Sequence, residues 1–267
     1  MLRTSLARLA EHINRTSLWH GEHRVWGQRM ASASFDRWLY LRLHRAGWIG
    51  SLERNALQQV VRPGMTVLDV GANLGLYTVL LSRLAGPTGR VIAFEPDKHH
   101  FALLTRNCAL NGCANVEAHN VALGDRSGRL ALRKRFFNTG ANTLGRPDTR
   151  SFPSEVEVDV VSLDEFLPAL RPDLVKIDVQ GWEVEVLSGM QRMLADSPHI
   201  AFHLEYFPEG LRHAGHSPAE LLDLLTKQNF QLYLIENSRH TLLDQDGLAT
   251  LTKRLTGFKY ADLYGVR

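Results

Sequence analysis

The residues best placed to do chemistry lie in one short stretch, 67–78, which reads VLDVGANLGLYT. An apolar, valine-rich run typical of a buried strand leads into it, and apolar residues at helical spacing follow. The glycines therefore fall on the connection between a strand and a helix. Glycine there permits positive φ and close approach of a ligand, and the first helical turn leaves backbone N–H groups unpaired. This turn is predicted to hold a nucleoside.

The spacing within the turn narrows the choice of ligand. A dinucleotide site would carry G-x-G-x-x-G to seat a pyrophosphate, whereas this turn reads Gly71-x-x-x-Gly75 with Asn73 in the middle. Asp69, just before the first glycine, would repel a diphosphate but would favour a cationic amino group. These residues fit the methionine end of S-adenosylmethionine.

Further candidates for cofactor contact surround the turn. Glu95 ends the next expected strand, 90–95, twenty residues after Gly75, the usual distance to an acid that accepts both ribose hydroxyls. On this ground alone Glu95 would serve NAD and S-adenosylmethionine equally. Tyr77 and Thr78 open the following helix and could contact the cofactor, although packing explains Tyr77 nearly as well. Glu53, on the helix expected before the first strand, could reach the amino group.

Two more acids, Asp178 and Glu205, end the fourth and fifth expected core strands, and ligands of open α/β sheets bind outside these carboxyl ends. Asp178 could contact the cofactor and deprotonate or orient an acceptor hydroxyl, with Glu205 assisting. Lys176 and His203 lie two residues earlier, on the same strand faces. His203 is a candidate base because its ordinary pKa is near neutral; a buried structural histidine is the alternative. A divalent metal is conceivable, but two ligands are too few to predict a metal site.

A parallel sheet is needed to bring these residues together. An amphipathic helix is expected over 51–61, after which strands and helices alternate. The expected core strands are 65–70, 90–95, 116–121, 174–179, 200–205, 230–235 and 259–266, with helices at 97–110, 181–194 and 218–228. Repeated strand-helix-strand units predict an α/β, doubly wound sheet of seven mostly parallel strands with helices on both faces. The hairpin-like final pair favours the methyltransferase variant of that fold.

Residues 1–50 differ in composition from the predicted methyltransferase domain, 51–267. They hold four of the five tryptophans, and residues 1–62 carry ten arginines against four acids. The simplest interpretation is an N-terminal helical cap whose tryptophans pack on the core while its arginines stay solvated. A basic aromatic surface could alternatively contact the acceptor, nucleic acid or, peripherally, an anionic membrane.

Two strand-like runs, 130–135 and 156–161, flank a polar stretch, and 137–154 is a candidate active-site flap in which Asn138 and Asn142 could contact the acceptor. No run approaches the roughly 18 apolar residues of a membrane span, and no apolar signal core opens the chain, so the predicted location is the cytoplasm. Cys108 and Cys113, the two cysteines, are expected to be buried reduced thiols.

Several segments together resemble one family. The turn at 67–78, Phe94-Glu95-Pro96, the segment 120–125 (NVALGD) and the strand exit 175–181 (VKIDVQG) are similar to those of FkbM-type S-adenosylmethionine methyltransferases, over about residues 52–265. The resemblance implies a Rossmann-like class I fold and methyl transfer, most often to a hydroxyl of a sugar, polyketide or similar secondary metabolite. It places Pro96, Asn120 and Ala122 beside the cofactor, and Gln180 and Trp182 beside the acceptor. The family usually has glutamate where this chain has Gln180, which removes one charge there.

Other functions stay open on the sequence. A nicotinamide oxidoreductase would share the fold and Glu95, but the dinucleotide glycine pattern is missing. A ribose or other RNA methyltransferase is prompted by the isoelectric point of about 9.0 and the basic N-terminus, although no motif for base methylation follows the fourth strand. Gln180 invites a third interpretation, a protein that binds the cofactor without turnover. The expected partner is a small-molecule or glycan acceptor rather than nucleic acid, and the sequence carries no signal for oligomeric state.

Overall fold

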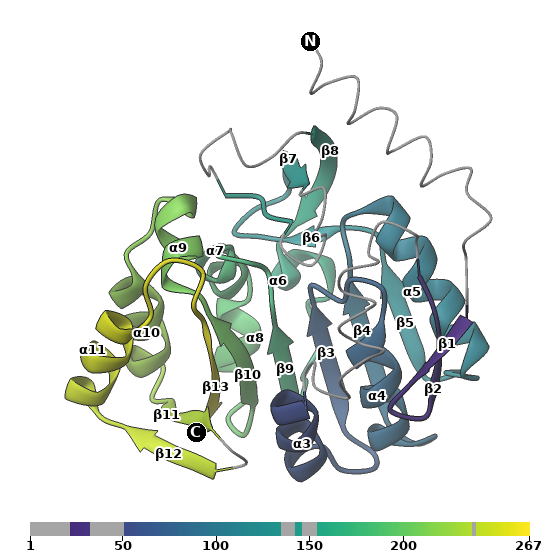
Figure 1. Cartoon of the computed structure of the whole chain (residues 1–267), viewed down its shortest axis with the longest axis horizontal. Helices are drawn as coiled ribbons and strands as arrows, with labels where there is room; N and C mark the ends of the chain where they lie inside the picture. The colour runs from purple at the N-terminus through teal and green to yellow at the C-terminus, as the bar shows by residue number, and fades with distance from the viewer. Residues whose placement is uncertain (1–21, 33–50, 135–141, 146–153, 237–238) are drawn as a thin grey trace.

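A central sheet organises the computed structural model, which describes residues 22–32, 51–134, 142–145, 154–236 and 239–267. Within these ranges the sheet has eight strands in the order β12-β11-β13-β10-β9-β3-β4-β5 (Figure 1). The strands are β3 (Thr66–Val70), β4 (Arg90–Phe94), β5 (Val116–His119), β9 (Leu174–Ile177), β10 (Ala201–Tyr206), β11 (Gln231–Glu236), β12 (Arg239–Leu243) and β13 (Ala261–Val266).

The strand directions agree with the doubly wound fold that the sequence predicts. Strands β5, β4, β3, β9 and β10 run parallel, and β13 lies antiparallel between β10 and β11. The expected number of seven strands is corrected to eight, because β12 pairs antiparallel with β11 at the sheet edge. Since the chain builds outward from β3 in one direction and from β9 in the other, the carboxyl ends of β3 and β9 form a topological switch point, where open α/β sheets bind ligands.

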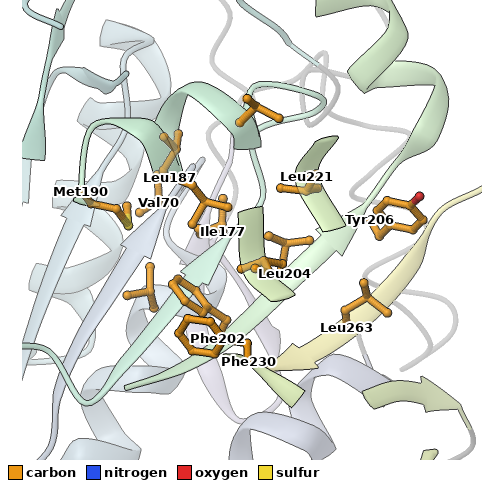
Figure 2. Close-up of a cluster of buried hydrophobic side chains, with 14 of the residues drawn as sticks. Val70, Ile177, Leu187, Met190, Phe202, Leu204, Tyr206, Leu221, Phe230 and Leu263 are labelled. Carbon is orange, nitrogen blue, oxygen red and sulfur yellow. The ribbon is translucent and has the colours of Figure 1, made fainter. Parts of the chain in front are cut away.

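Helices cover both faces because residues of the buried strands alternate in direction. Val67 packs with Leu57 and Leu81 beneath α3 (Ser51–Val60) and α4 (Leu76–Ala85), while its neighbour Leu68 joins the cluster on the opposite face. Figure 2 shows part of that second cluster, in which Val70, Ile177, Phe202 and Leu204 gather. The helices are α5 (Lys98–Leu110) beside α4, and α6 (Leu163–Phe166), α7 (Glu183–Ser188), α8 (Gln191–Ala195), α9 (Pro208–Ala214), α10 (Pro218–Lys227) and α11 (Gln245–Arg254) on the second side.

The single helix expected over 181–194 is two helices, α7 and α8, interrupted at Gly189 and Met190. A Cβ on Gly189 would lie 1.8 Å from the carbonyl oxygen of Gly124, so the chain passes too close to its neighbour for any side chain. The Ser162 hydroxyl donates to the Gly189 carbonyl, which also accepts from the Asp164 N–H. These contacts fix the interruption in place.

A small second sheet stands over the carboxyl ends of the parallel strands (Figure 1). It contains β6 (Ala122–Leu123), β7 (Gly128–Lys134) and β8 (Ser154–Val161), in the order β6-β8-β7. The two strand-like runs around the candidate flap therefore are strands. Of the flap itself only 142–145 lies in the described residues, and there Thr143 exchanges two backbone hydrogen bonds with Arg133. Asn138 lies outside them.

The described part of the N-terminal segment is a β-hairpin rather than a helix. Strands β1 (Glu22–Val25) and β2 (Gln28–Ala31) meet at a turn where Trp26 and Gly27 both have positive φ, 52° and 75°. This pair of angles is typical of a type I′ turn. The hairpin packs against α5, and the rest of the predicted helical cap lies outside the described residues. Within the described ranges, no helix is long and apolar enough to cross a membrane.

Candidate active site

The candidate site begins where the turn after β3 meets the chain leaving β9. Gly71 has φ of 82°, and a Cβ there would lie 2.0 Å from the carbonyl oxygen of Asp178. The Asp178 N–H in turn donates to the Val70 carbonyl at 3.0 Å. The two strand exits are therefore in backbone contact, and Gly71 is required by close approach as well as by its φ. We call this contact the seam.

Beyond the seam, the turn wraps around the start of α4. Asn73 and Gly75 also have positive φ, 51° and 87°, and no side chain caps the helix at Gly75. A Cβ on Gly75 would lie 2.7 Å from the Leu104 side chain, which holds the turn against α5. The first N–H groups of α4 are thus left without a side-chain cap at Gly75, as ligand binding at a helix N-terminus requires.

Glu95 lies at the carboxyl end of β4 and closes the turn from the second side. Its carboxylate accepts the Asn73 N–H and the Asp97 N–H, both at 2.8 Å, and its side chain is buried. Burial raises its pKa, while nearby His100 and the two backbone donors oppose that rise. The Asn120 amide donates to the carbonyls of Glu95 and Pro96 at 2.8 and 3.0 Å. The predicted cofactor residues of β3, β4 and the chain after β5 are thus joined in one network.

Asp69 is fully buried and lies on the α3 side of β3, paired in register with Lys176. Its carboxylate accepts the Thr78 hydroxyl at 2.7 Å, and its other oxygen lies 3.5 Å from the Lys176 ammonium. The Tyr77 ring lies 4.9 Å from the same ammonium, a cation–π distance. Asp69 and Thr78 are therefore occupied with each other and with a buried cation.

Lys176 is the cation at the centre of an acidic cluster. Its ammonium also lies 3.7 Å from Asp178, and its pKa is raised because the neighbouring carboxylates outweigh the effect of burial. Glu53 on α3, Glu205 on β10 and Asp262 on β13 complete the charges that act on it or on one another. We use "acidic cluster" for the residues Glu53, Asp178, Glu205 and Asp262.

Three members of the acidic cluster, Glu53, Glu205 and Asp262, have pKa values raised above those of free carboxyls. Partial burial and the carboxylates of Asp262 and Asp178 raise the pKa of Glu53 to about 8. Burial and Asp178 raise the pKa of Asp262 to about 7, and burial with four neighbouring acids raises that of Glu205. Crowding of like charges adds to burial in raising the pKa values of these three carboxyls.

Gln180 bridges two members of the cluster. Its side-chain amide donates to Asp178 at 2.9 Å and to Glu205, and its backbone has φ of 55°. The Thr143 hydroxyl donates to its carbonyl at 3.0 Å, so the described part of the flap lies directly over this strand exit. A glutamate at this position could not donate these hydrogen bonds when ionised.

The surroundings of His203 differ from those expected of a base. It is buried on β10, paired in register with Lys176, and burial together with that ammonium lowers its pKa to about 3. The near-neutral pKa expected from its residue type is therefore corrected: a neutral imidazole of such low basicity is a poor proton acceptor at neutral pH.

The remaining predicted residues lie around this centre. Ala122 is buried in β6, Trp182 is half-buried at the start of α7, and Asn142 opens the described flap segment. Asp262, which stands opposite Glu205 in the antiparallel pairing of β10 with β13, is absent from the sequence-based candidates. So is Tyr260, half exposed beside it, whose pKa is raised by burial and by the cluster. Among the described residues, no group of three His, Cys, Asp or Glu side chains is arranged to hold a metal.

The fold and the site define a Rossmann-like, class I methyltransferase architecture, with an antiparallel strand between two others, a glycine turn after β3 and an acid after β4. A crystal structure of a proposed O-methyltransferase from Klebsiella pneumoniae shares this fold, with a TM-score of 0.50 and 11% identity over all of both chains. Residues 69–232, more than half of the chain, match the methyltransferase FkbM domain. The chain therefore belongs to the FkbM family of S-adenosylmethionine-dependent methyltransferases, as its motifs predict.

Two curated relatives illustrate the family. Methyltransferase 1 of Beauveria bassiana is 34% identical over 144 residues, which cover 46% of this chain and 57% of the relative. Hexuronic acid methyltransferase AglP of Haloferax volcanii is 26% identical over 174 residues, covering 64% of this chain and 65% of the relative. The chain thus spans less than two thirds of the length of either protein.

Proposed function

We propose that the protein transfers a methyl group from S-adenosylmethionine to a hydroxyl oxygen of a neutral acceptor, such as a sugar, glycan or polyketide. The observation that carries this proposal is the seam at Gly71. On one side of it lie the glycine turn and Glu95, and on the other lie Asp178 and the rest of the acidic cluster. A donor and an acceptor bound on these two sides would meet at the switch point of the sheet.

The residues on the cofactor side fit the proposed donor. Glu95 keeps lone pairs beyond the two backbone N–H groups it accepts, so it can also accept the ribose hydroxyls. The uncapped start of α4 at Gly75 offers N–H groups to the methionine carboxylate. Asn120, which donates to the Glu95 carbonyl, and nearby Ala122 would flank the adenine that is attached to this ribose. When bound, S-adenosylmethionine supplies an electrophilic methyl group, so the protein has to align an acceptor oxygen and take up its proton.

Asp178 is the residue we assign to that proton. It lies at the seam, its side chain is 33% exposed, and the Gln180 amide fixes its orientation. Glu205 shares the same amide donor and stands ready to assist. The neighbouring carboxyls of Asp262 and Glu53 have pKa values of about 7 and about 8, so these two groups exchange protons near neutral pH, where general bases work best.

The charge of the cluster favours a neutral acceptor. Even where their raised pKa values keep Glu53 and Glu205 protonated, the carboxylates of Asp69 and Asp178 outnumber the single buried ammonium of Lys176, so a uronate or a phosphodiester would meet net repulsion. This supports a hydroxyl of a neutral acceptor over RNA, despite the basic composition of the N-terminus. The FkbM match and the missing dinucleotide glycines argue in the same way against a nicotinamide oxidoreductase.

Binding of S-adenosylhomocysteine tests the cofactor side. We expect Glu95→Ala to weaken its affinity, measured by calorimetry, by about tenfold to a hundredfold, because charge-assisted hydrogen bonds are lost. Glu95→Gln keeps one acceptor oxygen, so its affinity for S-adenosylhomocysteine should lie between those of the wild type and Glu95→Ala. Glu157→Ala, on the exposed face of β8, is the matched control and should bind as the wild type does. Unchanged affinity in Glu95→Ala would contradict the assignment.

Release of S-adenosylhomocysteine with matched acceptors tests the chemistry. A neutral hexoside should be methylated in preference to the hexuronate of the same configuration and to RNA. Asp178→Asn should lower kcat by about a hundredfold or more while S-adenosylhomocysteine still binds, as loss of a general base does. Faster turnover of the hexuronate or of RNA would overturn the neutral-acceptor proposal. Cofactor binding without turnover of any acceptor would favour the non-catalytic interpretation.

A further inference from the structure

The two cysteines of the chain meet at the C-terminal end of α5, at the edge of the sheet opposite the candidate active site. Gly112, with φ of 65°, follows the helix, and its N–H donates to the Ala109 carbonyl at 3.2 Å. The Cys113 N–H reaches back to the Cys108 carbonyl at 3.0 Å. This is the hydrogen-bond pattern of a Schellman motif, in which the side chains at the positions of Cys108 and Cys113 contact each other.

The geometry of this motif suits a disulfide. The 3.0 Å hydrogen bond from the Cys113 N–H to the Cys108 carbonyl brings the two main-chain segments together, and a disulfide needs Cα atoms about 4.4 to 6.8 Å apart. Both side chains also belong to the same apolar cluster, Cys108 within it and Cys113 packed against it. The backbone hydrogen bond and the shared cluster therefore place the two side chains next to each other.

The two thiols differ in access and in charge. Cys108 is buried, whereas Cys113 is half-buried and lines an open groove of about 650 Å³ together with Arg83, Arg90 and Asn115. The pKa of Cys113 is lowered to about 6 because the Cys108 thiol donates a hydrogen bond to it and Arg83 lies nearby. The same contact and burial raise the pKa of Cys108. An accessible thiolate with a protonated thiol behind it is the arrangement of a reactive and a resolving cysteine.

We propose that Cys108 and Cys113 form a reversible intramolecular disulfide when the protein meets a peroxide. The Cys113 thiolate attacks one oxygen of the peroxide, the O–O bond breaks, and the products are a sulfenic acid and hydroxide. The Cys108 thiol then attacks the Cys113 sulfur, forming the S–S bond and releasing water. Peroxide is reduced and the two thiols are oxidised by two electrons.

The disulfide would form in the turn that anchors the N-terminal hairpin. Asn111, between the two cysteines, accepts the Arg29 N–H at 3.0 Å and donates to the Arg29 carbonyl at 2.7 Å. Arg83 donates to the same side-chain oxygen of Asn111. The modification site is therefore remote from the seam but adjacent to the contact between α5 and β2.

Thiol counting on the full chain tests the proposal directly, because the chain has only two cysteines. The reduced protein should present two titratable thiols on denaturation and none after hydrogen peroxide, with an intact monomer mass lower by two hydrogen atoms. Dithiothreitol should restore both thiols. Peptide mapping should find 108 and 113 joined within one chain.

Two matched variants separate the roles of the cysteines. In Cys108→Ser, Cys113 should stop at a sulfenic acid that a cyclic 1,3-dione captures; in Cys113→Ser, Cys108 should react more slowly, by about tenfold or more. A wild-type protein that keeps both thiols, accumulates a sulfinic acid at Cys113, or forms only disulfides between chains would overturn the proposal. If either variant fails to fold, peptide mapping of the wild type alone decides.

Discussion

At the scale of single residues, Lys176 has the least freedom to change. It is a buried ammonium whose nearest charges are Asp69 at 3.5 Å and Asp178 at 3.7 Å, and the Tyr77 ring centroid lies 4.9 Å from it. Burying an ion is costly unless its partners compensate, and removing one partner leaves the others uncompensated. Lys176 thus couples the stability of the sheet to the charge of the candidate site.

We expect Lys176→Met to lower the free energy of unfolding by about 3 to 5 kcal/mol, because Asp69 then lacks its counter-charge in the core. Urea unfolding measures the loss, and Lys227→Met, at the exposed end of α10, is the control. The double variant Lys176→Met with Asp69→Asn should regain part of the lost stability, since the buried charge is gone. Additive losses in the double variant would contradict this pairing.

At the scale of elements, α5 binds the hairpin through two asparagine side chains, whose amides pair with the β2 backbone as a neighbouring strand would. Asn107 exchanges hydrogen bonds with the Ala31 backbone at 2.6 and 3.0 Å, and Asn111 does the same with Arg29. Four residues of helix rise about 6 Å and two residues of strand about 6.6 Å. The spacing of the two asparagines on α5 therefore matches the spacing of alternate residues on β2. Trp26 at the hairpin tip then reaches the Tyr77 ring, with centroids 5.5 Å apart.

Asn107→Ala should disturb this contact more than Asn111→Ala does. Asn107 is fully buried and also donates to the Leu74 carbonyl at 2.7 Å. Its loss leaves several buried backbone groups without a hydrogen-bond partner and should lower the free energy of unfolding by roughly 1 to 3 kcal/mol. Asn111 lies nearer to solvent, which can replace it. Hydrogen exchange at the Ala31 amide should accelerate most in Asn107→Ala. Equal acceleration in both variants would show that the buried amide is not the main anchor.

The elements divide into those that the sequence predicts and those that depend on distant contacts. Buried strands such as β3 and β9 are apolar runs and are found from composition. Helix α9 is not evident from the sequence because it contains Gly210, which lowers helix propensity; a Cβ at Gly210 would lie 2.4 Å from the Phe207 ring, so glycine is kept there for close approach. The turn at Trp26-Gly27 carried the only local signal for the hairpin, a glycine at the second position of a two-residue turn.

At the scale of the whole molecule, the acidic cluster exists only because the sheet order brings α3, β9, β10 and β13 together. Asp178 and Glu205 could be predicted because each ends an apolar strand. Asp262 could not, since its place opposite Glu205 depends on the register between segments far apart in sequence. A directly opposed pair of like charges costs stability in a sheet, so no rule of stable pairing would have suggested it.

The cluster predicts how stability depends on pH. Glu53 and Asp262 titrate near pH 4 in an unfolded chain, but have pKa values of about 8 and about 7 in the folded protein. Between these limits Glu53 and Asp262 bind more protons in the folded protein than in the unfolded chain, whereas His203, with its pKa lowered to about 3, binds fewer below about pH 6.5. Because the carboxyls with raised pKa values outnumber this histidine, the free energy of unfolding should fall as pH rises from about 4 to about 8. Glu53→Gln should flatten this fall and exceed the wild type by roughly 1 to 3 kcal/mol near pH 8.

Urea unfolding of both proteins across that range measures the slope, with Glu157→Gln, exposed on β8, as the control that keeps the wild-type slope. A wild-type stability that rises steadily over the same range would contradict the raised pKa values. The variant's gain should also vanish near pH 4, where the Glu53 carboxyl is protonated in both states.

The seam at Gly71 has a consequence for how acceptor preference can be altered. Because the Asp178 carbonyl leaves no room for a side chain there, the spacing between the two halves of the site is set by main chain and not by rotamers. Asp262 and Tyr260 stand on the other side of the acidic cluster, on β13 and the chain before it. If the acceptor binds beside the acidic cluster as proposed, we expect substitutions at these two positions to change acceptor preference without moving the groups that would hold the methyl donor, which makes β13 the place to begin redesigning specificity.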